Sequence, residues 1–567
     1  MKFLRTSLVL LLLLAVAGAA WLWFNRPAQV DLAKYAPADS LLYVELNKPS
    51  DVARAIQQTD VWKAAAPITQ SKAPSENRLA MMAARAGIGP IDAVLFARAQ
   101  VALTVVGLNA AEQDDTLRVK PEFALIVETH TSAWRTKPAV LDAVKRLAGF
   151  VYGASNCSER SADAEYVECS VAGGERKIVG AIDGTLVVVG NTENAVRVVL
   201  EAKRGTRPNI LTDAEMVRVR SRLASDQTLG FGYISASNSA KLFSWAAPLV
   251  MGRGPGDRQL EQLLAVSAGK ILRGVAWTAV PNDGGIEDRY LVSLEPEVVS
   301  RLQPAFDTAE RNEDFWKLVP GGFESLTIYR SKEPALAWRS LDSAVALKLD
   351  ALPAVLFGTI LKSSLTPYGI GDPKEVLTTL APPLLTLRPS AAVEGSVLVA
   401  RVVDEARLRR SLAQDVFKAS NGQIVQGIQA ELDPELEYSA VFSDGYVLLG
   451  RTENMEPCLA ALRRSEAMNA GNKIKQASQE SSAAILTYAN DEMRLRSFIS
   501  TLLMLQGRRL SAEELARLQN SVRDYSFSST ETRLDSTGIE RKTHSAFGQF
   551  STFVSMVGAD SSNIAAR

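Results

Sequence analysis

The sequence feature that most constrains this chain is an internal duplication, because two copies of one unit must repeat the same turns, buried strands and helix starts. The clearest match joins residues 183–194, which begin Asp-Gly and end Gly-Asn-Thr-Glu-Asn, to residues 444–454, which begin Asp-Gly and end Gly-Arg-Thr-Glu-Asn. Each segment is typical of a turn, a strand, a glycine and a helix start. Three later pairs share one sequence offset: Tyr233 with Tyr488, Phe243 with Phe498, and Gly252 with Gly507.

The order of the patterns predicts the fold class. Both copies close with two alternating strands around a turn, at residues 274–287 and 525–540, which is typical of a β-hairpin. Strands alternate with helices, but many neighbouring strands are linked by hairpins, so we expect an α+β fold with mainly antiparallel sheets and packed helices. The first α+β unit is expected at residues 31–306 and the second at residues 316–567. A short charged linker, residues 307–315, should tether them closely.

The amino terminus predicts a membrane anchor. Residues 6–24 carry no charge and follow Lys2 and Arg5. A helix of that length would be about 28 Å long, close to the ~30 Å hydrocarbon core of a bilayer, and the two cations favour a cytoplasmic amino end. We therefore expect residues 1–30 to hold a single transmembrane helix with the body exported. A cleaved signal peptide is the alternative, and the apolar stub that includes Trp21 and Trp23 favours the retained anchor.

The three cysteines fit an exported body. Cys157 and Cys169 flank a polar turn that enters an alternating stretch, so they could face each other across a hairpin as a disulfide. Two free surface thiols are the alternative. Cys458 aligns with Val198 of the other copy, which predicts a buried and unreactive thiol.

Composition and motifs exclude several classes of chemistry. Lys and Arg number 63, as do Asp and Glu, so the surplus of positive charge that nucleic-acid binding normally needs is missing. The only histidines are His130 and His544, and no motif for a zinc, nucleotide or serine-hydrolase site accompanies them. Ser267 and Lys270 have the Ser-x-x-Lys spacing but lack its companion motifs. We therefore expect no enzyme, catalytic residue, metal or cofactor.

Two recurring features are candidate sites. The Thr-Glu-Asn segments starting at Thr192 and Thr452 are interpreted as helix caps, and Pro457 places the second cap near Asn454. The apolar segments 242–252 and 495–507 are interpreted as core helices. A sharper hypothesis is that they line a groove for a lipid-like ligand, or rest on the membrane while flanking arginines contact anionic headgroups. Those arginines are Arg253, Arg508 and Arg509.

The combination of one amino-terminal anchor, a Pro-x-x-Ser-Leu strand opening at Pro37 and the Asp-Gly-strand-Gly-x-Thr-Glu-Asn step resembles an uncharacterised bacterial family of membrane-anchored exported proteins, a domain of unknown function. The resemblance implies a bacterial envelope protein and transfers no catalytic residue. With it, the expected location is the inner membrane, crossed once, with the body in the periplasm.

These patterns lead to three hypotheses about function. The first is a non-enzymatic binding or scaffold protein whose partner is another envelope component. The alternative is a carrier of a lipid-like hydrophobic ligand, and the third is an enzyme that uses Ser267 and Lys270.

Overall fold

The computed structural model describes part of the chain, and all structural statements below concern that part. The described residues are 29–46, 49–69, 99–113, 116–131, 133–153, 156–171, 176–239, 269–309, 314–349, 351–414, 416–419, 421–464, 471–505 and 510–552. Residues 29–306 are called the first half and residues 314–552 the second half.

The strands of the first half form one antiparallel run of neighbours, in the order β4, β5, β6, β7, β3, β2, β1, β8, β9, β10. Their bounds are β1 Leu42–Leu46, β2 Gln100–Gln113, β3 Thr116–Glu128, β4 Asn156–Ser161, β5 Glu165–Ser170, β6 Lys177–Asp183, β7 Leu186–Gly190, β8 Gly230–Ser235, β9 Leu272–Asn282 and β10 Gly285–Leu294.

The second half has the order β14, β15, β16, β13, β12, β11, β17, β18, β19, in which only the β14–β15 pair is parallel. The bounds are β11 Ser325–Tyr329, β12 Leu380–Arg388, β13 Val397–Val402, β14 Gln423–Gln426, β15 Tyr438–Ser443, β16 Tyr446–Arg451, β17 Ile485–Asn490, β18 Phe527–Asp535 and β19 Gly538–Ser545.

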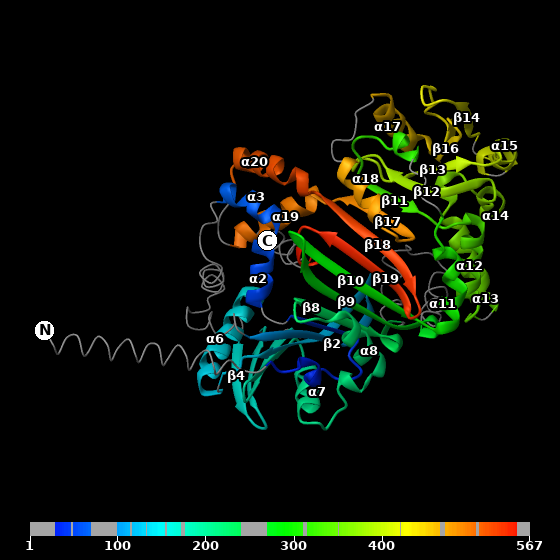
Figure 1. Ribbon diagram of the computed structural model, residues 1–567. Helices are drawn as coiled ribbons and strands as arrows, with labels where there is room; N and C mark the ends of the chain where they lie inside the picture. Colours follow the sequence, from blue (N-terminus) through cyan, green and yellow to red (C-terminus); the bar gives the residue numbers. More distant parts are fainter. Residues whose placement is uncertain are drawn as a thin grey trace, which may run out of the picture.

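The two halves share one continuous sheet, because β10 pairs antiparallel with β19 from Ile286 opposite Ser545 to Ser293 opposite Gly538. We call this pairing the seam; its strands cross the middle of Figure 1. A glycine stands where each hairpin meets the other half. A β-carbon on Gly538 would lie 2.0 Å from the carbonyl oxygen of Val292, and one on Gly285 would lie 2.6 Å from that of Ser545. Side chains at these two positions would push the strands apart.

Helices cover both faces of the sheet. In the first half they are α2 Pro49–Gln58, α3 Asp60–Thr69, α6 Ala133–Tyr152, α7 Glu193–Lys203, α8 Ala214–Leu223 and α11 Pro296–Phe306. In the second half they are α12 Pro334–Ala346, α13 Ala351–Ser363, α14 Pro373–Leu377, α15 Glu405–Gln414, α16 Val416–Ala419, α17 Thr452–Arg463, α18 Gly471–Glu480, α19 Glu492–Leu505 and α20 Ala512–Val522. Short 3-10 helices lie at Leu32–Tyr35, Ile210–Thr212, Asp314–Leu318, Thr366–Tyr368 and Arg523–Tyr525.

Burial explains why β6 is apolar at successive positions. Val179 and Ala181 pack in one core with α7, while Ile178 and Ile182 pack in another core with α6. A strand covered on both faces needs no polar alternation. Across the seam, α3 packs against α19 and α20 in one shared core, visible as a helical group at the upper left of Figure 1.

The fold prediction holds in its coarser part, since the chain is a mixed α and β protein with a large antiparallel sheet. Sequence reasoning did not foresee that one sheet runs through both halves. The start of the linker is bound closely to the second half: Ala309 donates its N–H to the carbonyl oxygen of Arg330 at 2.8 Å. In the described residues no helix is long and apolar enough to cross a membrane, and the predicted anchor lies outside them, apart from residues 29 and 30.

Candidate functional site

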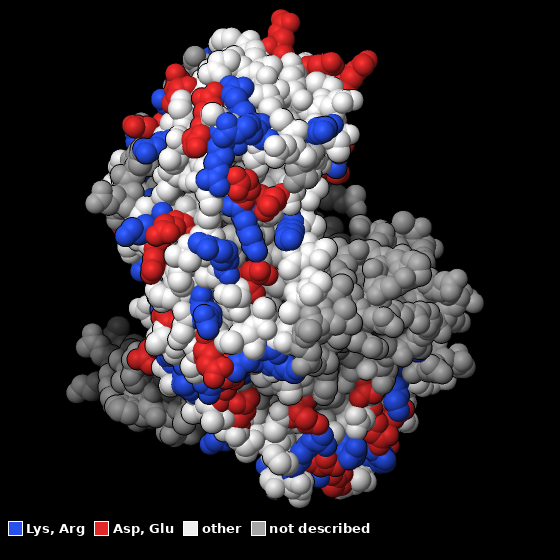
Figure 2. Space-filling model, turned by 90° about the vertical axis from the view of Figure 1, so that its right-hand side faces the viewer, with Lys and Arg blue, Asp and Glu red and all other residues white. Residues whose placement is uncertain are grey.

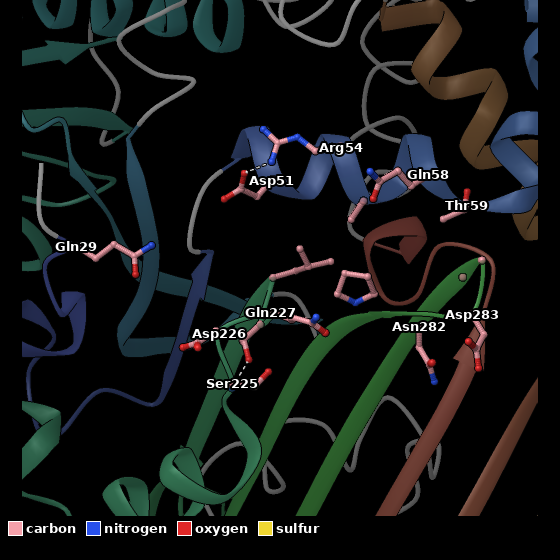
Figure 3. A pocket seen from close by; sticks show the side chains of 16 residues that line it. Gln29, Asp51, Arg54, Gln58, Thr59, Ser225, Asp226, Gln227, Asn282 and Asp283 are labelled. Carbon is pink, nitrogen blue, oxygen red and sulfur yellow. Dashed lines mark hydrogen bonds and ion pairs between the residues drawn. The ribbon is translucent and has the colours of Figure 1, made fainter. Parts of the chain in front are cut away.

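A pocket of about 690 Å³ lies beside α2, bordered by three other segments of the first half (Figure 3). Gln29 comes from the segment that precedes β1, and the turn 225–229 connects α8 to β8. The hairpin turn 281–285 connects β9 to β10. The lining residues are Gln29, Asp51, Arg54, Ala55, Gln58, Thr59, Ser225, Asp226, Gln227, Thr228, Leu229, Pro281, Asn282, Asp283, Gly284 and Gly285.

Local hydrogen bonds hold the pocket walls in place. Asp283 and Gly284 form a two-residue hairpin loop with φ angles of 39° and 74°, the left-handed pair that a tight hairpin turn requires. The N–H of Asp60 donates to the carbonyl oxygen of Gly284 at 2.7 Å, which ties α3 to this loop. The turn 225–229 is closed by the N–H of Ser225, which donates to Thr228 Oγ1 at 2.8 Å. These contacts use main-chain groups and the Thr228 hydroxyl, and they do not involve the amide and carboxylate side chains of the walls.

The polar side chains of the pocket are largely unengaged. Arg54 pairs with Asp51 at 2.9 Å on the exposed side of α2 (Figure 3). Five of the lining amide and carboxylate side chains make no hydrogen bond or ion pair with the described residues: Gln29, Gln58, Gln227, Asp226 and Asp283. Three carboxylates against one guanidinium leave the lining with a formal charge of −2. Unbonded amides and carboxylates around a cavity can accept and donate hydrogen bonds to a polar ligand.

An apolar core supports the pocket from below. Ala55 and Leu229 line the pocket and also pack with Trp277 and Phe550. The Trp277 and Phe550 rings meet edge to face, with centroids 6.3 Å apart. Phe550 belongs to residues 546–552, so a segment of the second half supports a pocket of the first.

A buried carboxyl group lies in the same region. Asp288 on β10 is 1 % exposed. Its Oδ1 accepts from Trp277 Nε1–H at 2.8 Å, and its Oδ2 accepts from the N–H of Gln549 at 3.0 Å. Burial raises the pKa of Asp288 to about 7, although both hydrogen bonds favour the ionised form.

The predicted cysteine pair is joined. Cys157 and Cys169 lie directly opposite each other on β4 and β5 and form a disulfide bond, with their α-carbons 4.1 Å apart. Cys458 is fully buried in the second-half core, and burial raises the pKa of its thiol to about 12. A thiol in that state is inert, as the sequence predicts.

The proposed lipid or membrane contacts Arg253, Arg508 and Arg509 lie outside the described residues, as does the segment 242–252. The second apolar segment forms most of α19, whose Leu495, Phe498, Ile499 and Leu503 are buried beside α3 and α20. These four side chains are core residues and do not line an open groove. Ser267 also lies outside the described residues, while Lys270 is exposed.

Of the two expected helix caps, one is confirmed and one is wrong. Thr192 is the N-cap of α7, with its hydroxyl accepting from the N–H of Ala195 at 3.1 Å. The cap near Asn454 is wrong, because α17 begins at Thr452 and contains Pro457 in its interior. The Thr452 hydroxyl instead shares a 2.8 Å hydrogen bond with Ser439 on β15. Pro457 is therefore the sixth residue of α17 and does not mark its first turn.

The histidines make no catalytic arrangement in the described residues. His130 Nε2 shares a 3.0 Å hydrogen bond with Gln100 Oε1, and His544 lies opposite Glu287 across the seam. Burial lowers the pKa of His544. No group of His, Cys, Asp and Glu among the described residues could hold a metal ion.

Charges of both signs are interleaved on the face shown in Figure 2. Helices at the right of Figure 1 carry ion pairs such as Arg407 with Glu375 at 2.7 Å and Lys348 with Glu297 at 2.6 Å. In the described part of this face, such pairing places cations and anions side by side.

The pocket could not be found by sequence reasoning, because its lining comes from positions as far apart as Gln29 and Gly285 and forms no local motif. Comparison with family models, with curated proteins and with solved structures found nothing that matches this chain.

Proposed function

We propose that this protein is a membrane-anchored, extracytoplasmic binding protein of the bacterial envelope that performs no chemistry and holds another envelope component in the α2 pocket. One observation carries the proposal: five lining side chains, all amides or carboxylates, have no partner among the described residues. Polar groups held on a fixed framework without partners are available to a ligand. The ligand would be polar, in keeping with the lining.

The position of the pocket supports a site near the membrane. Gln29 lines the pocket, and the predicted apolar span ends at Phe24, five residues earlier. Five extended residues reach at most about 18 Å. The pocket would therefore open close to the membrane surface, where a membrane-bound component could reach it. The disulfide between Cys157 and Cys169 fits an oxidising compartment such as the periplasm.

We also propose that the body arose by duplication, with the two halves as copies. The order of strand neighbours supports this: β7, β3, β2, β1, β8, β9, β10 in the first half parallels β16, β13, β12, β11, β17, β18, β19 in the second. The close-contact glycines Gly285 and Gly538 occupy matching places at the two ends of the seam.

The binding proposal is tested on the full chain, extracted from its membrane in mild detergent, by mass spectrometry of the molecules that co-purify. We expect a polar molecule that the wild type retains and Gln58→Trp loses, because the indole would fill the pocket. Gln414→Trp is the matched control, since Gln58 and Gln414 are the last residues of two ten-residue helices. Equal retention by both variants would contradict the pocket as the binding site.

The predicted topology is tested separately. Protease added to spheroplasts should degrade the body of the full chain, while intact cells should protect it. Protection in both preparations would contradict the exported location.

A further inference from the structure

The buried carboxyl group of Asp288 connects three segments that are distant in sequence. Asp288 itself is on β10, Trp277 donates from β9, and Gln549 donates its main-chain N–H from residues 546–552. The fit is close, because a β-carbon on Gly548 would lie 2.8 Å from Asp288 Oδ2. The carboxyl group is therefore part of the attachment that holds residues 546–552 on the sheet.

The same segment is attached to the core below the pocket. Phe550 packs with Val52 and Ala55 of α2, and Phe547 packs against Trp62 of α3, their ring centroids 6.4 Å apart. Ala55 lines the pocket directly. Any loosening of residues 546–552 would remove packing from α2 and so disturb the pocket wall.

Within the described part of the chain, no cation compensates the charge of Asp288. Among the described residues no ion pair forms with it, and the neighbouring Glu287 adds like charge. Residues 546–552 contain no ionisable side chain, and on α2 Asp51 and Arg54 pair with each other. The other ionisable groups around this region are Tyr290 on β10, Arg541 and His544 on β19, and Arg494 on α19. A buried carboxylate without a counter-charge costs more than its neutral form.

We propose that Asp288 makes the docking of residues 546–552, and with it the integrity of the α2 pocket, dependent on pH. The segment is held firmly while the carboxyl group is protonated and is loosened when it ionises. The link to ligand retention rests on the proposed binding function, whereas the docking itself does not.

The sign follows from proton linkage. Burial raises the pKa of Asp288 to about 7 when the segment is docked, whereas an exposed Asp side chain titrates near its ordinary value of about 4. Docking is therefore most favourable below about pH 4 and weakens as the pH rises to about 7, by at most about tenfold per pH unit. His544 acts in the opposite direction: burial lowers its pKa, so it costs stability as the pH falls below its ordinary value.

Hydrogen exchange of the full chain in detergent, corrected for the intrinsic dependence of exchange on pH, measures this docking without a ligand. We expect the protection of residues 546–552 against hydrogen exchange to fall at least about tenfold between pH 5 and pH 7.5. This fall is smaller than the upper limit of about tenfold per pH unit that proton linkage allows up to about pH 7. In Asp288→Asn this drop should disappear, leaving only the opposite contribution of His544, and in His544→Gln the drop should be larger.

The matched control is Asp491→Asn, which removes another buried acid whose pKa burial raises. It should leave the pH dependence of residues 546–552 unchanged. If Asp288→Asn does not fold, Trp277→Phe replaces it: loss of the indole donor disfavours the ionised form, so the drop should move to higher pH. Protection that is independent of pH in the wild type, or an undiminished drop in Asp288→Asn, would overturn the proposal.

Retention of the co-purified molecule provides the second measurement. It should be lower at pH 7.5 than at pH 5 in the wild type, whereas in Asp288→Asn it should be no lower at pH 7.5 than at pH 5. Equal wild-type retention at both pH values would overturn the coupling to the pocket, while leaving the pocket as a binding site. If the pocket variant Gln58→Trp still retains the ligand, the binding function is contradicted. The docking result does not depend on that outcome.

Discussion

Strand β1 of the first half and strand β11 of the second half hold corresponding places in the sheet, but their buried side chains differ in chemistry. On β1, Tyr43 lies opposite Tyr233 of β8, and on β11, Leu326 lies opposite Tyr488 of β17. Two residues further along, β1 carries Glu45, whereas the position two residues after Leu326 carries an isoleucine. The first half thus buries an acid where the second half buries a hydrocarbon.

The acid is tolerated because other elements satisfy it. Glu45 accepts from the Tyr43 hydroxyl at 2.6 Å and from Arg220 of α8 at 2.7 Å, and Arg220 also donates to Asp31 at 2.7 Å. Burial raises the pKa of Glu45, opposed by Arg220. In the second half, Leu326 and Ile328 pack with Ile474 of α18. Along the chain, α18 comes between α17 and β17, just as α8 comes between α7 and β8 in the first half. The backbone pairing is the same, so strand order is independent of the chemistry of the core.

Removing Arg220 should have the largest effect. Arg220→Ala leaves Glu45 buried without a counter-charge, and we expect the free energy of unfolding at pH 8 to fall by about 4 kcal/mol. The loss should shrink at pH 5, because a raised pKa lets Glu45 become neutral in the folded state. Urea denaturation at the two pH values measures both effects.

The double variant Arg220→Ala with Glu45→Ile sharpens the comparison, since it installs the residue type of the second half. Most of the stability should return, because no buried charge remains. A double variant as unstable as the single one would show that packing of the arginine, rather than its charge, stabilises the first half.

Truncating the apolar core of the second half should cost slightly less. Leu326 is fully buried, and Leu326→Ala should lower the free energy of unfolding by about 3.5 kcal/mol through lost burial and a residual cavity. This loss should be equal at pH 5 and pH 8, since no ionisable group is uncovered. A loss that changes with pH as in Arg220→Ala would contradict the contrast between the two cores.

The smallest effect is expected where the halves meet at the surface. Arg222 of α8 pairs with Asp535 and donates to Thr537 at 2.5 Å, joining the first half to the β18–β19 hairpin. Partial burial raises the pKa of Asp535, but the hydrogen bonds from Arg222 and Thr537 outweigh it and hold the pKa at about 2. Arg222→Ala should lower the free energy of unfolding at pH 7 by about 1 kcal/mol.

The sign with pH separates this ion pair from the buried network. A lowered pKa gives stability that is present above about pH 4 and is lost as the pH falls through 2, so the difference between Arg222→Ala and the wild type should be clearly smaller at pH 2.5 than at pH 7. Urea denaturation at pH 7 and pH 2.5 checks this. A difference that is as large at pH 2.5 as at pH 7 would assign the contribution of Arg222 to packing instead of charge.

Much of the local structure could be predicted from sequence because its causes are local. Asp-Gly pairs at Asp183 and Asp444 lie at hairpin turns, and Thr192 caps its helix through a neighbour three residues away. The pairing of Cys157 with Cys169 followed from short spacing and alternation. The predicted cap near Asn454 is wrong, because α17 begins two residues earlier at Thr452, whose hydroxyl bonds to Ser439 on a strand that no local pattern connects to it.

The sequence by itself predicted a mixed α and β protein with antiparallel hairpins, and it favoured the pairing of Cys157 with Cys169 and the burial of Cys458. These features depend on turn chemistry, spacing and hydrophobic pattern within short segments. Only the tertiary structure decided that β10 and β19 join the halves into one sheet, that Asp288 is buried beneath residues 546–552, and that the α2 pocket exists. The physical reason is that these features arise where distant segments exclude water together. Their hydrogen bonds and burial carry no signature at any single position.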